Sequence, residues 1–509
     1  MNRANTLVLL MLLVGSRFFM SAVTGYTSDD AFITYRYAEN LGNGNGFVYN
    51  VHERVQGTSS PLYTWILACV SYVFGAQWIS LASRLVSLFS DALSLVLIMR
   101  ILSSSGAGAQ FLAGALFALY PKVLLISNSG MEIPVVAMLM LLSFHCFQRD
   151  RPVLAFAVFG ILLLARADAF IWVFMCVSLW VWQKKTIPLI APLFPLVLFG
   201  VWLVFSFLYF GSVIPHSIIA KRVSWQHLFG FFEPVRVLLG YFPFHALRGF
   251  LAPVTASMIV IMLAPVIVVG VHLFRRKDPL FIFPAFFIVY NMVFAFGRVI
   301  MADWYYLPGF VAYFVTLGSG WGWFVDSLPS VRAKVNLDTL LRYSIVPPLI
   351  FLVIVGAYRW AHDPGDWFQH EHVRIGHWLK EHAPDDASVL LEPVGYIGWE
   401  SKLYIHDNVG LVSPDVLAYR QRLAGSDAWF MEYIQDHRPT YVILQDWELP
   451  RNQLFLGYGD GMFRGTSDRQ WFLSHYELVE FNSRPERGDS VHFVIYHQVG
   501  PEVREGSSF

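Results

Sequence analysis

The sequence has few charged residues and few cysteines for its length. Only 14% of its 509 residues are Asp, Glu, Lys or Arg, and 36 basic side chains balance 36 acidic ones. A net charge of zero gives no sign of a nucleic-acid partner. The three cysteines, Cys69, Cys146 and Cys176, all lie in apolar segments. The polar loops and the C-terminal part therefore have neither a disulfide framework nor a thiolate metal site.

The sequence also shows no nucleotide-binding motif and no internal repeat. The run Gly42–Gly46 lies between two helical patches, not between a strand and a helix, so it is a flexible turn and not a phosphate-binding loop. A cleaved signal peptide is disfavoured, because Arg17 interrupts the first apolar run and no small-residue cleavage site follows it. We therefore expect the first span to be retained as a membrane helix.

Long apolar runs dominate the rest of the chain, in which 56% of residues are hydrophobic. A helix of about 20 apolar residues crosses the ~30 Å hydrocarbon layer of a bilayer. The pattern predicts a polytopic α-helical membrane protein. We expect eleven membrane helices, near residues 6–24, 80–101, 107–121, 131–148, 152–165, 168–183, 187–209, 250–275, 279–297, 304–324 and 342–360.

Basic side chains gather between alternate spans. Arg3, Arg100, Lys184 and the cluster Arg275–Lys277 fall on one side of the membrane in this count. The positive-inside rule makes that side cytoplasmic. The acidic loop after the first span, and everything after about residue 361, then face the opposite, outer side.

The chain divides into a membrane domain, residues 1–360, and an extracytoplasmic α/β domain, residues 361–509. The first outer loop, residues 25–79, includes the apolar segment Pro61–Gly75, which is too short to span and suits the membrane interface. In the second domain an amphipathic helix over Asp366–His382 precedes the strands, and further helices fall near 414–437. The expected strands are 388–394, 402–409, 440–446, 476–481 and 491–497. Three polar residues there are interpreted as ordinary strand and turn groups: Glu392, His406 and Asp407.

Two adjacent carboxylates, Asp29 and Asp30, follow the first span within a few residues, and Arg36 and Glu39 lie on the next turns. Charged groups at this depth are poor anchors and suit a reactive site. A solvated loop, with an acidic pair capping a helix, explains them equally well on chemistry alone. Their surroundings must decide.

Further ionisable residues reach the same outer face, namely Glu132, Arg166, Asp168 and Lys221. Each alone fits helix capping, pairing or snorkelling. Together with the acidic pair they predict a shared polar cavity beside the lipid. There a carboxylate can take a proton from an incoming hydroxyl, while cations hold a departing phosphate. Group transfer from a lipid phosphate suits this combination.

Several segments resemble, in order, motifs of the GT-C superfamily of polyprenyl-phosphate-sugar glycosyltransferases. The acidic pair is that superfamily's hallmark, and DDAFITYRYAENLGNGNGFVYNVHERVQGTSSPLYTW (29–65) is most similar to bacterial arabinofuranosyltransferases of the terminal mycobacterial type. Further similar segments are SGMEIP (129–134), ARAD (165–168), YFGSVIPHSIIAK (209–221) and GYIGWESKLYIHDNVGLVSPDV (395–416). Two departures bear on sugar selectivity: His216 stands where we expect Asn, and ADWYYLPGF lacks a doubled Gly before Asp303.

The resemblance implies a GT-C fold, a polyprenyl monophosphate-sugar donor, arabinofuranose as the favoured sugar, and inversion at the anomeric carbon. It makes Asp29 the general base, with Asp30 orienting the acceptor or Arg36. Lys221 and Arg166 are the expected ligands of the donor phosphate. The remaining donor-site candidates are Arg36, His216, Glu132 and Asp168. Some relatives bind a divalent cation, but no ligand set in this sequence compels one.

The expected partners are a polyprenyl-phosphate sugar, a glycan or protein acceptor, and the lipid bilayer. The expected location is the bacterial inner membrane, with the active site and the C-terminal domain facing the periplasm. Two alternatives stay open. One is a GT-C transferase for a hexose or aminoarabinose. The other is a lipid-linked sugar transporter or flippase, which usually shows internal repeats or helices broken near the midplane.

Overall fold

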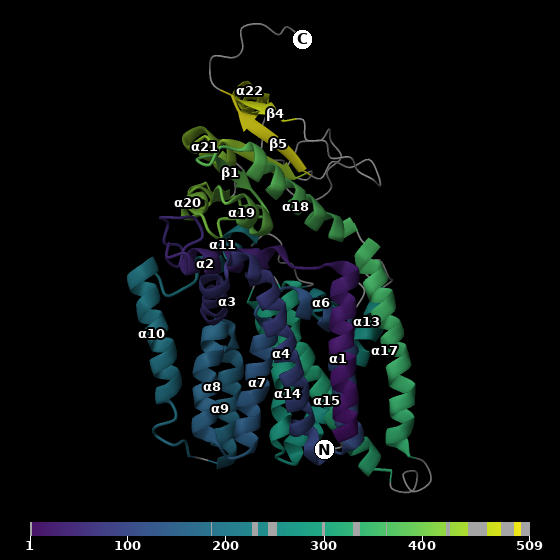
Figure 1. The fold of residues 1–509 in the computed structure, drawn as a ribbon. Coiled ribbons are helices and arrows are strands. Elements are labelled where there is room, and N and C mark those ends of the chain that lie inside the picture. The colour runs from purple at the N-terminus through teal and green to yellow at the C-terminus, as the bar shows by residue number, and fades with distance from the viewer. Residues whose placement is uncertain are drawn as a thin grey trace.

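The protein consists of a helical bundle with a mixed sheet at one end (Figure 1). The computed structural model describes residues 3–184, 186–225, 233–242, 252–297, 301–328, 336–362, 364–423, 428–445, 466–479 and 493–499. The N-terminus lies at the end of the bundle away from the sheet (Figure 1). We call the end that carries the sheet the outer end.

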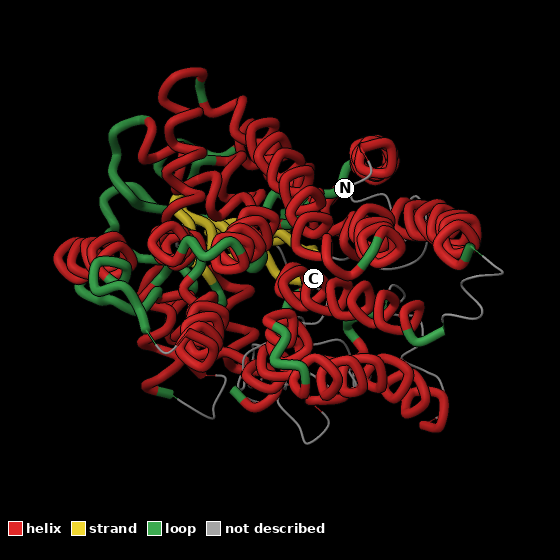
Figure 2. The backbone as a smooth tube through the Cα atoms, turned by 90° about the horizontal axis from the view of Figure 1, so that it is seen from below, coloured by secondary structure: helices red, strands yellow, loops and turns green. Residues whose placement is uncertain are grey.

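Each of the eleven segments predicted to cross the membrane contains a helix. These are α1 (Arg3–Thr24), α4 (Ile79–Ile101), α5 (Ala107–Leu119), α7 (Ile133–Gln148), α8 (Pro152–Ala165), α9 (Phe170–Lys184), α10 (Leu193–Phe210), α13 (Ala252–Arg275), α14 (Ile282–Phe296), α15 (Tyr306–Asp326) and α17 (Leu337–His362). Within the described residues, six helices are long and apolar enough to cross a membrane, or seven if the bent pair α5 and α6 (Pro121–Asn128) forms one span. Figure 2 shows the helices from below, with the strands beyond them. The predicted polytopic helical fold is confirmed.

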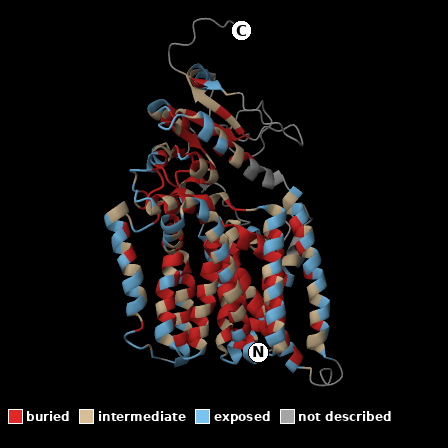
Figure 3. Ribbon diagram, viewed as in Figure 1, coloured by how far each residue is buried: buried red, intermediate tan, exposed pale blue. Residues whose placement is uncertain are grey.

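The outer surface of the bundle is apolar, as contact with lipid requires. Helix α10 buries only Trp202 and Ser206, while Val201, Phe207 and Leu208 are each more than 60% exposed. Figure 3 shows exposed faces along the peripheral helices and buried residues between the helices. Soluble monomers rarely expose contiguous apolar patches larger than a few hundred Å², so these surfaces fit the hydrocarbon layer.

A break between α5 and α6 brings buried charge into the bundle. Pro121 begins α6 after a bend of 55°, and because proline has no N–H it cannot donate to the carbonyl of Phe117. Arg17 of α1 supplies the missing donors, from Nη2 to the Phe117 carbonyl (3.2 Å) and from Nη1 to the Ala118 carbonyl (2.5 Å). The arginine that interrupts the first apolar run thus caps a broken span.

The same arginine forms an ion pair with Asp91 of α4, with Nε 3.0 Å from Oδ2. The Arg17 and Asp91 side chains are only 5% and 0% exposed. Removing one member of such a buried pair leaves the other charge uncompensated, which costs much more than losing a solvated pair. Arg17 therefore ties α1 to α4 and to the end of α5.

Short helices and the C-terminal region cover the outer end of the bundle. The short helices are α2 (Asp29–Gly42), α3 (Pro61–Phe74), α11 (His216–Trp225) and α12 (Glu233–Leu239). Short 3-10 helices also occur along the described chain, namely η1 (Ala76–Trp78), η2 (Leu102–Ser105), η3 (Ala167–Ala169), η6 (Pro279–Phe281) and η7 (Asp303–Tyr305). Helix α3 matches the short apolar segment expected at the interface. Its exposed residues include Tyr72 and Phe74.

The C-terminal region (residues 364–499) begins two residues after α17 ends. Its elements are α18 (Pro364–His382), β1 (Ser388–Leu391), α19 (Gly395–Ser401), β2 (Tyr404–Asp407), α20 (Pro414–Arg422), α21 (Ala428–His437), β3 (Tyr441–Gln445), α22 (Thr466–His475), β4 (Tyr476–Leu478) and β5 (Phe493–Gln498). All five predicted strands are present, in the order β2-β1-β3-β5-β4. Strands β2, β1 and β3 are parallel, whereas β5 is antiparallel to β3 and β4.

The Arg17 pair gives a testable prediction about stability. We expect Arg17→Met to lower the free energy of unfolding by about 3–5 kcal/mol, because Asp91 is left buried without its partner. The matched control is Lys184→Met, whose partner Asp150 lies at 2.8 Å but is 68% exposed; a solvated pair of this kind contributes about 0–1 kcal/mol. Unfolding of the detergent-solubilised variants measures both effects, and equal effects would contradict the capping role of Arg17.

Candidate functional site

The acidic pair opens helix α2 at the outer end of α1. Ser28 before it is extended (φ −66°, ψ 141°), and the helix begins at Asp29. Two acids in the first turn are favourable there, because the N-terminal end of a helix carries partial positive charge. Successive side chains on a helix point about 100° apart. The two carboxylates therefore face different surroundings.

Asp29 faces the C-terminal region. Its Oδ2 accepts a hydrogen bond from the Gly395 amide (2.8 Å), and its Oδ1 accepts one from the Tyr396 amide (2.9 Å). His372 Nδ1 lies 3.3 Å from Oδ1. Burial acts to raise the pKa of Asp29, but the contacts with His372 and the two amides outweigh it and hold the pKa below its ordinary value. Asp29 is absent from the cavity lining, and the base role expected for it stays a prediction.

Asp30 faces a cavity at the outer end of the bundle. Its Oδ2 lies 3.6 Å from Lys221 Nζ of helix α11, and the two side chains are only 29% and 21% exposed. Burial raises the pKa of Asp30; Lys221 lowers it, Asp29 raises it further, and the net direction is upward. Burial acts to lower the pKa of Lys221, but Tyr305 and Asp30 reverse this and raise it. The cavity thus holds a partly buried carboxylate beside an ammonium.

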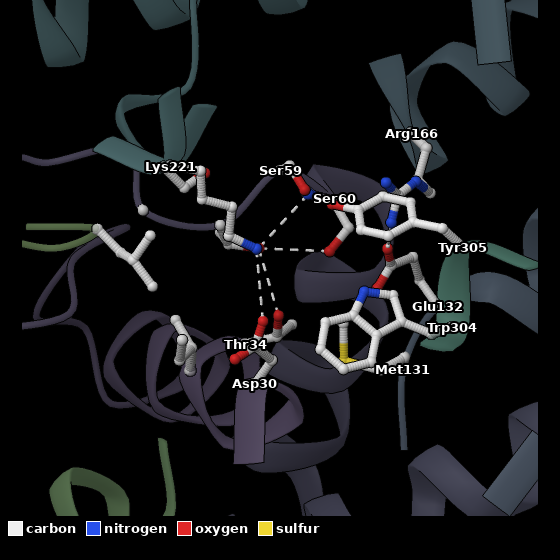
Figure 4. A pocket seen from close by; sticks show the side chains of 15 residues that line it. Asp30, Thr34, Ser59, Ser60, Met131, Glu132, Arg166, Lys221, Trp304 and Tyr305 are labelled. Atoms are coloured by element: carbon white, nitrogen blue, oxygen red, sulfur yellow. Dashed lines mark hydrogen bonds and ion pairs between the residues drawn. The ribbon is translucent and has the colours of Figure 1, made fainter. Parts of the chain in front are cut away.

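The cavity lies between the outer helices and the bundle, with about 410 Å³ of space, including its open mouth. Figure 4 shows the Lys221 side chain pointing toward Asp30 and Thr34 on one side and toward Ser59 and Ser60 on the other. Hydroxyls therefore surround the ammonium. The apolar wall comes from Ile33, Met131, Trp304 and Leu411.

Arg166 is held by two carboxylates at the far side of the cavity. Its Nη1 lies 2.6 Å from Glu132 Oε1, and its Nε lies 2.8 Å from Asp168 Oδ1. Arg166 and Glu132 line the cavity, whereas Asp168 stands behind them. The predicted convergence of these residues is present, but a guanidinium already paired with two acids has less attraction left for another anion.

Tyr305 lies over Arg166, with the guanidinium carbon 4.4 Å from the ring centre. It belongs to the turn η7, which is fixed by an ion pair of 2.9 Å between Asp303 and the buried Lys122 of α6. A hydrogen bond of 2.9 Å from the Tyr290 hydroxyl to the Tyr305 carbonyl adds to this. Tyr305 and its neighbour Trp304 are therefore presented to the cavity by a well-supported turn.

Two expected donor-site residues lie outside the cavity lining. Arg36 donates to the carbonyls of Tyr49 (2.9 Å), Gly398 (2.6 Å) and Leu403 (2.7 Å), so it joins the first outer loop to the C-terminal region. Its role at the donor stays a prediction. His216 starts α11, where its amide donates to the Gln56 carbonyl. The neighbouring Ser217, not His216, lines the cavity.

The hydroxyl groups of the cavity were not predicted from the sequence. Thr58, Ser59 and Ser60 line it and immediately precede Pro61, the first residue of α3. A Ser-Pro step at a helix start is a recognisable signal, because serine is a favoured N-cap and proline suits the first helical position. Hydroxyls and a helix N-terminus next to Lys221 make this side of the cavity suitable for an anion.

The acids in and near the cavity are poorly disposed to hold a divalent cation. Both oxygens of Asp29 accept amide hydrogens, Asp30 faces Lys221, and Glu132 is paired with Arg166. Among the described residues, no group of three or more His, Cys, Asp and Glu side chains is placed to hold a metal ion.

Comparisons with known proteins bear on the fold and on part of the chain. A family described as a domain of unknown function (DUF8728) matches residues 361–496. No curated protein matches. Two crystal structures of ArnT from Cupriavidus metallidurans are similar along nearly the whole length. The structure bound to undecaprenyl phosphate has a TM-score of 0.58 at 12% identity, over 98% of this chain and 99% of that one. The apo structure has a TM-score of 0.60 at 11% identity, over 97% of each chain. The chain therefore has an ArnT-like fold.

Proposed function

We propose that this protein is a GT-C-type glycosyltransferase, which moves a sugar from a polyprenyl monophosphate to a hydroxyl group of an acceptor. The observation that carries the proposal is the pairing of Asp30 with Lys221, 3.6 Å apart, in a partly buried cavity at the outer end of an apolar bundle. Likeness in fold to ArnT, which is described in complex with undecaprenyl phosphate, supports the class of donor.

In the proposed reaction, Asp30 is the general base. It takes the proton from the acceptor hydroxyl while the acceptor oxygen forms a bond to the anomeric carbon. The bond between that carbon and the phosphate oxygen breaks, and its electron pair leaves with the polyprenyl phosphate. Attack opposite the leaving group inverts the anomeric centre. The growing negative charge on the phosphate is stabilised by Lys221, with the hydroxyls of Ser59 and Ser60 on the same side.

The other ionisable groups hold parts of the site in place. Asp29 anchors the C-terminal region by accepting two of its amides, and this fixes the start of α2. Arg166, held between Glu132 and Asp168, supports Tyr305 at the cavity wall. We propose these roles in place of Asp29 as base and of Arg166 as a ligand of the donor phosphate beside Lys221.

The sugar follows from sequence resemblance alone. Arabinofuranose is the donor sugar we propose first, with a hexose and aminoarabinose as the competing donors. We also propose a membrane domain of residues 1–360 and an α/β domain of residues 361–509. In this arrangement the protein lies in the bacterial inner membrane and the cavity faces the periplasm, where the acceptor is a glycan or a protein.

Substitution of each acid in turn distinguishes Asp30, the proposed base, from Asp29, the proposed anchor of the C-terminal region. We expect Asp30→Asn to slow transfer by roughly 10²–10⁴-fold, the usual contribution of a positioned base, with little change in thermal unfolding. Asp29→Asn should lower the free energy of unfolding by about 1–3 kcal/mol, because one amide of the C-terminal region loses its acceptor. Purified protein is assayed with synthetic polyprenyl-phosphoryl arabinofuranose beside the mannose and glucose donors.

Wild-type turnover by Asp30→Asn would exclude Asp30 as the base. A rate loss confined to Asp29→Asn, at unchanged stability, would return the base role to Asp29. Use of a hexose donor by the wild-type protein would keep the mechanism and replace the sugar.

The pH dependence tests the Asp30–Lys221 pair. The base must be ionised, and the pKa of Asp30 lies above the ordinary 3.8, so transfer should fall as the pH is lowered through a value higher than that. Because Lys221 lowers the pKa of Asp30, Lys221→Met should move this acidic limb to higher pH. The profile of kcat/KM against pH measures both effects, and a limb that stays in place in Lys221→Met would refute the coupling.

A further inference from the structure

Within its described residues, the C-terminal region contributes one segment to the cavity. We call residues 407–413, which begin at the last residue of strand β2, the Asp407 loop. Leu411 of this loop lines the cavity together with Gly57 and Ser217. The matching family is described only as a domain of unknown function. The contacts of the Asp407 loop indicate what the C-terminal region contributes to the cavity.

The buried carboxylate of Asp407 determines the shape of the loop. Its side chain is 0% exposed, and its Oδ1 and Oδ2 accept the amides of Val409 (2.8 Å) and Val412 (3.0 Å). Gly410 makes the turn with φ 85°, a left-handed conformation that suits glycine. Its amide donates to the Asp407 carbonyl (2.9 Å). One side chain thus fixes the whole loop, because an unpaired buried acceptor or amide is costly.

The Asp407 loop holds the helix that carries Lys221. The Ser224 hydroxyl of α11 donates to the carbonyl of Val409 (2.9 Å). Ser224 is buried and stands three residues after Lys221, so it lies on a neighbouring position of the same helix. The loop therefore restrains α11 close to Lys221.

The same loop is in close contact with the segment that supplies the cavity hydroxyls. A Cβ atom added to Gly57 would lie 2.6 Å from Val412 Cγ1 and 3.1 Å from the carbonyl oxygen of Leu411. Only glycine allows this close approach, and Thr58, Ser59 and Ser60 follow directly. The loop thus touches α11, the hydroxyl segment and the cavity itself.

We propose that Asp407 is a positioning residue for sugar transfer, and that the C-terminal region is a built-in part of the reaction centre. Asp407 fixes the loop, the loop holds α11 and the 57–60 segment, and Lys221 is thereby kept against Asp30 while Leu411 bounds the cavity. This role rests on the proposed function. This role differs from simple packing of the C-terminal region on the bundle, because a substitution of Asp407 must then change the position of Lys221.

The first test needs no sugar donor. Hydrogen–deuterium exchange is measured on the full-length protein in detergent, for wild type, Asp407→Asn, Ser224→Ala and the control Asp436→Asn. Asp436 is an exposed carboxylate of the same region that accepts from the Tyr419 hydroxyl. We expect faster exchange in residues 216–225 for Asp407→Asn and Ser224→Ala, and no change for the control. Unchanged exchange of residues 216–225 in folded Ser224→Ala would contradict the proposal that the Asp407 loop restrains α11, even if Asp407→Asn fails to fold.

The second test uses the proposed reaction. Loss of the Ser224 hydrogen bond should lower kcat/KM about fivefold, since such bonds contribute about 1 kcal/mol. Displacement of Lys221 from Asp30 should also move the acidic limb of the pH profile upward, as in Lys221→Met. A limb that stays in place, with only a smaller yield of active protein, would overturn the positioning role. Absence of turnover with every donor, even in the wild type, would instead count against the proposed function, because the exchange experiment does not depend on it.

Discussion

The arrangement of the outer end depends on the hydrogen bonds between Asp29 and the amides of Gly395 and Tyr396. A carboxylate that accepts two amides is a strong, charge-assisted junction, and it joins the first turn of α2 to the C-terminal region. Because neighbouring side chains on a helix diverge by about 100°, engaging Asp29 in this way turns Asp30 to the cavity. Arg36 strengthens the same junction through its bonds to the carbonyls of Gly398 and Leu403. Two adjacent acids therefore have separate tasks, one in assembly and the other in the cavity.

Much of the fold could be predicted from the sequence, since long apolar runs and alternating short strands are local signals. The eleven helices and five strands follow from them. The gathering of Glu132, Arg166 and Lys221 was also predictable, because charge beside lipid must find partners. The different partners of Asp29 and Asp30 were not, because these partners stand 366 and 191 residues away in the chain. The same holds for Arg36: nothing near it in the sequence reveals that Gly398 and Leu403 offer it carbonyls. The Thr58–Ser60 hydroxyls, in contrast, precede a helix-starting proline and were open to prediction.

Buried charge stabilises the bundle as well as the cavity. Arg17 occupies carbonyls exposed by the break before Pro121, and Lys122, the next residue, pairs with Asp303 at the start of the turn that carries Trp304 and Tyr305. One break in a span thus has two consequences. The break requires a cation in α1, Arg17, to bind the free carbonyls. It also places Lys122 next to the turn that forms part of the cavity wall. The polar groups of the membrane part are connected to the cavity through this broken helix.

The Asp30–Lys221 pair has a further consequence for the proposed reaction. Before the donor binds, Lys221 faces Asp30 and lowers its pKa, in opposition to burial and to the charge of Asp29. A donor phosphate next to Lys221 brings negative charge that competes for the ammonium and adds to the field at Asp30. Both effects raise the pKa of the carboxylate, since a nearby opposite charge favours its ionised form and a like charge disfavours it. Asp30 then binds a proton more readily at the moment when an acceptor hydroxyl must lose one. In the proposed reaction, occupancy by the donor is therefore coupled to the strength of Asp30 as a base, provided that α11 holds Lys221 where both anions can reach it.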